Sequence, residues 1–114
     1  MTTNENRHRV ASEFIHAALR DENSRATREK CAFDAGYVYL LIALNSPVGG
    51  EHPGVEQLQR GINQLGVGSE KMSVALTFLK RQDSPYEAVD LLEKLLHWAQ
   101  AMRELATGTS HLCI

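Results

Sequence analysis

Apolar residues recur three and four positions apart along most of the chain, a spacing that is typical of amphipathic helices. It predicts a first helix over about residues 4–21, a second over 24–45 and a third that starts near Pro53 and stops at Gly66. A fourth helix is expected to begin after Ser69, and a fifth to run from Pro85 to about Leu105. No useful stretch alternates between apolar and polar residues, so no half-buried strand is expected.

The second predicted helix differs from the others because residues 31–44 are almost all apolar. A helix that is apolar on most of its sides belongs at the centre of a bundle. A buried strand over residues 38–42 is the rival interpretation. We reject it because the pattern continues for about twenty residues without a turn signal, well beyond common strand lengths.

Residues with strong turn and capping preferences separate the apolar stretches. Residues 46–54 are too rich in Pro and Gly for a helix. Ser84, Pro85 and Glu87 match a capping box, in which Ser precedes the helix, Pro takes its first position and Glu follows the Ser by three residues. The chain is therefore predicted to be all-α, an antiparallel up-and-down bundle of four to five helices, with one domain over residues 1–107 and a flexible tail over 108–114.

Composition and charge limit the classes of function. The chain has 114 residues, 43% of them apolar, which is enough for one domain with a hydrophobic core. Its formal net charge is −2, so no global basic field attracts nucleic acid, although a local basic patch remains possible. The longest apolar run, residues 38–44, is too short to cross a bilayer, and the N-terminus lacks a secretory pattern. We expect a cytoplasmic protein without membrane association.

Histidines and cysteines do not form a recognisable metal or catalytic pattern. The five histidines are scattered and lack standard ligand spacing. Cys31 falls within an apolar helix and Cys113 near the end of the chain, so they are not expected to form a disulfide. No nucleophile elbow, phosphate loop or dinucleotide motif is present. The sequence predicts neither a metal site nor a cofactor.

Two polar groups interrupt or follow the apolar stretches and are candidate site residues. Asp34 and Tyr37 are three residues apart in the second helix and should share a face. We favour a structural ion pair or an exposed stripe there, and a functional cleft is the alternative. Lys80 and Arg81 precede the last helix, where they either complement the end of the fourth helix or join the free amides of the fifth in holding a phosphate. On spacing alone we favour the charged helix end.

The order of these features resembles the HEPN superfamily, the higher-eukaryote and prokaryote nucleotide-binding domain, in its small stand-alone bacterial form. A charged lead-in precedes the apolar run 31–44, a Gly-rich loop ends at residues 51–53, and a short amphipathic helix follows. Residues 79–87 then open a long final helix. The resemblance covers about residues 8–106.

The resemblance implies a site at the junction of the last two helices. In this family an Arg, a polar residue that is commonly Asn, and a His four to six positions after the Arg form an RNase site, while many small members show Arg-Asn-x-x-x-Tyr. Arg81 matches the Arg, Gln82 stands where Asn is usual, and Tyr86 matches the Tyr. The expected positions hold no His, which leaves His52 as the one loop His that folding could bring near. Binding without RNA cleavage is therefore expected.

The resemblance also implies a homodimer whose two junctions face each other, and pairing with a small nucleotidyltransferase in a toxin–antitoxin-like arrangement. We expect a module that binds RNA, a nucleotide or a partner protein. A helical adaptor or chaperone-like protein and an active ribonuclease toxin are the alternatives. The expected binding residues are Arg81, Gln82, Tyr86, Lys80, Asp34, Tyr37 and His52.

Overall fold

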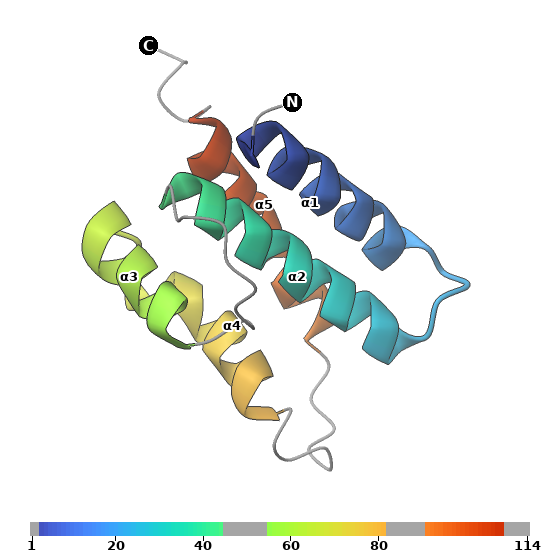
Figure 1. The fold of residues 1–114 in the computed structure, drawn as a ribbon. Helices are drawn as coiled ribbons and strands as arrows, with labels where there is room; N and C mark the ends of the chain where they lie inside the picture. The colour runs from blue at the N-terminus through green and yellow to red at the C-terminus, as the bar shows by residue number, and fades with distance from the viewer. Residues whose placement is uncertain (1–2, 45–54, 82–90, 109–114) are drawn as a thin grey trace.

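The computed structural model describes residues 3–44, 55–81 and 91–108 of the chain, and these residues form helices and turns without a strand. The helices are α1 (Thr3–Leu19), α2 (Arg25–Ala43), α3 (Val55–Leu65), α4 (Ser69–Arg81) and α5 (Leu92–Thr107), as shown in Figure 1. The predicted all-α helical bundle is confirmed. None of the described helices is both long enough and apolar enough to cross a membrane.

Helix α2 lies at the centre of the bundle, as its apolar sequence predicts. It packs along α1 on one side and along α5 on another, and α3 also contacts it. Helices α3 and α4 pair with each other, on the side of α2 away from α1 (Figure 1). Most of the circumference of α2 is therefore covered by other helices of the same chain.

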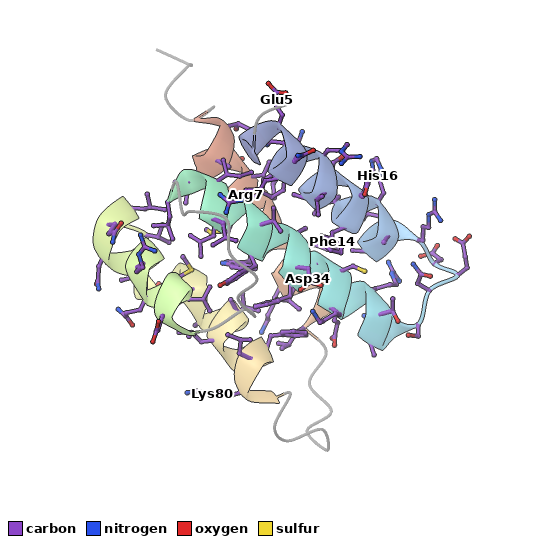
Figure 2. The ribbon with its side chains drawn as sticks, in the orientation of Figure 1. Glu5, Arg7, Phe14, His16, Asp34 and Lys80 are labelled. Atoms are coloured by element: carbon purple, nitrogen blue, oxygen red, sulfur yellow. The ribbon has the colours of Figure 1, made fainter. Side chains whose placement is uncertain are left out.

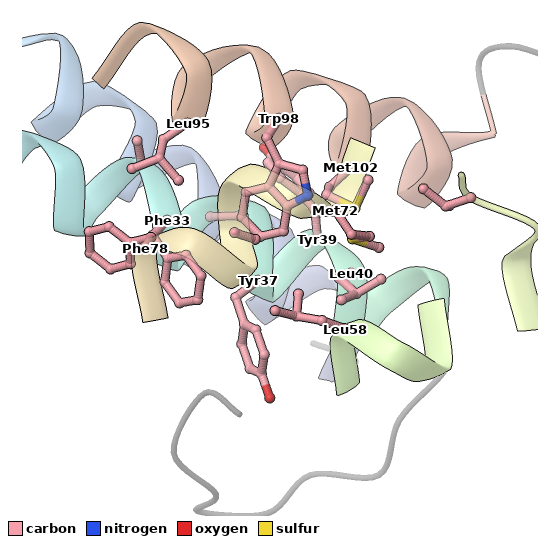
Figure 3. Packing of buried hydrophobic residues seen from close by; sticks show 14 of the residues in the cluster. Phe33, Tyr37, Tyr39, Leu40, Leu58, Met72, Phe78, Leu95, Trp98 and Met102 are labelled. Atoms are coloured by element: carbon pink, nitrogen blue, oxygen red, sulfur yellow. The ribbon is translucent and has the colours of Figure 1, made fainter. Parts of the chain in front are cut away.

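A stack of aromatic rings forms the middle of the core (Figure 3). The ring of Phe33 on α2 stacks on Tyr37, on Phe78 of α4 and on Trp98 of α5, with centroid distances of 6.0, 4.8 and 5.5 Å. Helix α2 presents Gly36 to the indole, and a Cβ atom at that position would lie 2.3 Å from Cζ3 of Trp98. The aromatic stack thus joins three helices, and the absent side chain of Gly36 lets α2 and α5 approach.

Local capping signals account for several helix ends. The hydroxyl of Ser24 accepts a hydrogen bond from the amide of Thr27 at 3.2 Å and so caps the start of α2. Gly66 follows α3 with φ of 69°, and Gly108 follows α5 with φ of 67°. This left-handed conformation is one that Gly adopts easily. The sequence predicted that the third helix stops at Gly66, and this prediction is confirmed.

Helix α5 begins at Leu92, later than the expected start at Pro85. Leu91 is its N-cap and forms no side-chain capping bond of its own. Its amide instead donates a hydrogen bond to Oε2 of Glu29 on α2, at 2.9 Å. A contact from a distant part of the sequence therefore marks the start of α5. The predicted capping box at residues 84–87 lies outside the described residues.

Candidate functional site

The cationic part of the expected site lies at the end of α4. Lys80 is exposed in the last turn, and Figure 2 shows its side chain pointing away from the rest of the bundle. Arg81 is the last residue of the helix. The other expected members of this junction, Gln82 and Tyr86, and the loop residue His52 lie outside the described residues. The described part of the site is therefore a cationic helix end.

Asp34 forms an ion pair with Lys30 on the surface of α2. The two carboxylate oxygens accept hydrogen bonds from the Lys30 ammonium at 2.7 and 2.9 Å. The residues are four apart, one helical turn, and the side chain of Asp34 retains 19% of its exposure. The sequence favoured a structural ion pair or an exposed stripe at Asp34, and the structure shows the ion pair. Figure 2 shows Asp34 and Lys80 on separate parts of the bundle, with neither side chain directed toward the other.

Tyr37 lies in different surroundings, although it is only three residues from Asp34. Its residue surface is 5% exposed, and its ring stacks on Phe33 inside the core. Figure 3 shows the hydroxyl at the edge of the cluster, pointing away from the other rings. Asp34 is thus a surface residue paired with Lys30, whereas Tyr37 contributes mainly to the core.

Glu29 is the residue at this end of the bundle that the sequence analysis missed. Among the described positions it is the one charged residue that is buried, with 5% exposure. Its carboxylate accepts a hydrogen bond from the amide of Leu91. The alternative interpretation of Lys80 and Arg81 had free amides of the last helix join them in holding a phosphate. The expected first residues of that helix, 85–87, lie outside the described residues, but the Leu91 amide is not available, because it is bound to Glu29 and this carboxylate opposes a second anion there. The available signal was the spacing of Glu29, four residues before Phe33 and on the same face of α2.

The electrostatics of α2 leave Cys31 a poor nucleophile. Burial raises the pKa of the Cys31 thiol, the Asp34 carboxylate raises it further, and Lys30 lowers it. The thiolate, which is the reactive form, is therefore disfavoured near neutral pH. Among the described residues no group of three or more His, Cys, Asp or Glu side chains is arranged to hold a metal ion.

Comparison of the chain with protein-family models, with curated proteins and with solved structures finds no match in any of the three. The class that the described residues define is an all-α bundle in which one helix ends in adjacent cations. A flexible ammonium and a planar guanidinium at such an end can bind phosphate oxygens, the guanidinium through two parallel hydrogen bonds.

Proposed function

We propose that the protein is a HEPN-like helical module that binds RNA, a nucleotide or a partner protein through the end of α4, without catalysis. The observation that carries the proposal is the exposure of Lys80 beside Arg81 in the last turn of α4. The order of the sequence features supports it, because this helix end precedes the Arg-Gln-x-x-x-Tyr segment that resembles the family's motif. The absence of a His four to six positions after Arg81 supports binding in place of cleavage.

Phosphate groups are the ligand chemistry that this helix end suits best. Two adjacent cations attract phosphates in a way that depends on salt, since each neutralised phosphate releases counterions. The Leu91 amide is held by Glu29, so the attraction rests on Lys80 and Arg81. Partner proteins that bind through a large apolar surface are less well supported, because Leu19 is the one large apolar side chain that is mostly exposed among the described residues. RNA and nucleotides as ligands agree with the expected cytoplasmic location.

Titration of labelled single-stranded RNA tests the proposal. We expect salt-dependent binding to the wild type, and weaker binding with a smaller salt slope for Lys80→Ala and for Arg81→Ala. Arg103→Ala is a matched control because Arg103 is an exposed cation on α5, away from the start of that helix. Unfolding free energies should stay within about 0.5 kcal/mol for Lys80→Ala and Arg103→Ala, because both side chains are exposed, and we predict the same for Arg81→Ala.

The same titration contains the results that would reject the proposal. If the wild type binds neither RNA nor a nucleoside triphosphate in a salt-dependent manner, a phosphate site is excluded. The alternative of a helical adaptor or chaperone-like protein is then favoured. RNA cleavage by the wild type that Arg81→Ala abolishes would show an active ribonuclease, contrary to the absence of catalysis. Equal loss of binding in Arg103→Ala would show a general charge effect in place of a site.

A further inference from the structure

A groove of about 420 Å³ lies between α4 and α5, apart from the proposed phosphate site. Helix α4 contributes Glu70, Ser73 and Val74 to its walls. Its volume falls within the range of small-molecule sites, about 300–1,000 Å³. The groove exists because α5 packs along α2 much more extensively than along α4. The face of α5 that looks toward α4 is therefore only partly covered.

The floor of the groove is apolar and rigid. It includes Val74 of α4 and both Trp98 and Ala101 of α5. The indole of Trp98 is fixed from below, because Cζ3 and Cε3 pack against Gly36 and the ring stacks on Phe33. Its Nε1 atom, on the other side of the ring system, is buried, and no described residue accepts its hydrogen. Trp98 is only 3% exposed, so it supports the floor from below, and the accessible apolar surface comes mainly from the half-buried Val74 and Ala101.

The two ends of the groove carry opposite charges. Helices α4 and α5 run in opposite directions (Figure 1), so Glu70, early in α4, lies toward the Ala101 end of the groove. Lys94 and His97 lie toward the other end, and Lys94 is about 10 Å along the helix axis from Ala101. Glu70, Lys94 and His97 are all exposed, and none forms an ion pair with another described side chain.

We propose that this groove binds a small extended zwitterion. Its carboxylate would lie at the Lys94 and His97 end, its ammonium at the Glu70 end, and its short methylene chain across Val74 and Ala101, above the buried Trp98. An anion without the ammonium would leave Glu70 unmatched, and a cation without the carboxylate would leave Lys94 unmatched. A polyanion such as RNA fits poorly because one end of the groove is negative. The two ion pairs are exposed to solvent, so weak binding is expected.

The single tryptophan of the chain provides a direct measurement. Its indole N–H gives one resonance in a proton–nitrogen correlation spectrum, and that resonance reports on the floor of the groove. We expect 6-aminohexanoate to shift it in a saturable way. Hexanoate and hexylamine carry the same carbon chain with only one of the charges, and each should bind severalfold more weakly. No saturable shift, or equal binding of the three compounds, would overturn the proposal.

Variants of the exposed end residues assign the two charges. Glu70→Gln should abolish the preference for 6-aminohexanoate over hexanoate, and Lys94→Gln should reduce the preference over hexylamine. Arg103→Gln is the control, since Arg103 is exposed on α5 but does not line the groove. Unchanged preferences in the first two variants would refute the assignment. Arg81→Ala should leave zwitterion binding intact, so this test can succeed or fail independently of RNA binding.

Discussion

Gly36 is the residue at which α2 and α5 are brought together, because its missing side chain makes room for the indole of Trp98. A Cβ atom would lie 2.3 Å from Cζ3 and 2.5 Å from Cε3, both on a rigid ring held in the aromatic stack. Gly36→Ala should therefore lower the free energy of unfolding by about 1–3 kcal/mol through overpacking. The loss should occur although Ala is favoured over Gly in a helix by about 1 kcal/mol. Urea denaturation measures it.

Two other glycines are controls for this prediction. A Cβ atom at Gly61 would lie 2.7 Å from Cε of Met72 and 2.9 Å from Cδ1 of Leu40, which are the movable ends of flexible side chains. Gly61→Ala should therefore cost less than Gly36→Ala. Nothing lies within 4 Å of a Cβ atom at Gly68, so Gly68→Ala should be close to neutral. Equal losses at all three positions would contradict the packing argument.

The charges around Cys31 lead to a prediction about thiol reactivity. Burial and the Asp34 carboxylate hold the pKa of the thiol above its ordinary value, while Lys30 acts in the opposite direction. In a Cys113→Ser background, alkylation should accelerate only at a higher pH than for the same thiol in urea. Asp34→Asn should lower the pKa and move the rate profile to lower pH, and Lys30→Met should raise the pKa and move the profile to higher pH. Shifts of the same sign in both variants would refute this account.

At the level of elements, Glu29 on α2 binds the backbone at the start of α5. Its buried carboxylate binds the Leu91 amide, and its loss would leave that amide without this partner. Glu29→Ala should reduce the unfolding free energy by about 1–3 kcal/mol. Glu29→Gln retains an acceptor oxygen and should cost less. Hydrogen exchange of the first-turn amides of α5 should accelerate in Glu29→Ala, because the helix end loses its cap.

Glu93 supplies the control for this experiment. It is an exposed carboxylate in the first turn of α5, where its charge favours the helix through the dipole. Glu93→Ala should cost no more than about 1 kcal/mol. A larger effect there than in Glu29→Ala would mean that charge near the helix start, and not the buried hydrogen bond, stabilises α5.

The helix ends show which features of the fold can be predicted from sequence. Ser24, Gly66 and Gly108 act on their immediate neighbours, so their capping roles follow from local preferences. The Lys30–Asp34 pair was likewise predictable because it spans one helical turn. The start of α5 was not, since Glu29 and Leu91 are 62 residues apart in sequence and meet only after folding.

The candidate sites also include one part that the sequence could predict and one that it could not. Lys80 and Arg81 were identified from their position at a helix end, and the structure has α4 end at Arg81. The groove between α4 and α5 could not be predicted, because it depends on how Trp98 packs against Gly36 and on how little α4 covers α5. Helical periodicity assigns a residue to a face of its own helix. It does not determine how closely a neighbouring helix approaches that face.

For the whole molecule, one stripe of α2 is only partly buried among the described residues. The other faces pack on α1, α3 and α5. The remaining stripe of α2 differs from the faces that pack on α1, α3 and α5. Its residues are mostly apolar, but they are only partly buried. It consists of Cys31, Asp34, Val38 and Leu41. Such a stripe along the central helix favours contact with a second copy, in which like surfaces meet about a two-fold axis.

We therefore predict a homodimer at micromolar concentration, in which this partly buried stripe of α2 contributes to the interface together with α5. Sedimentation equilibrium measures the association. Val38→Glu should shift the equilibrium toward monomer. In a two-fold interface the new carboxylate of each subunit would be buried close to the same carboxylate of the other subunit, without a cation to pair with. Thr77→Glu, an exposed position on α4, is the control and should leave the association unchanged. Thermal midpoints measured in parallel separate lost association from lost folding. A wild-type protein that sediments only as monomer, or a folded Val38→Glu variant that stays fully dimeric, would show that this face of α2 is not the interface.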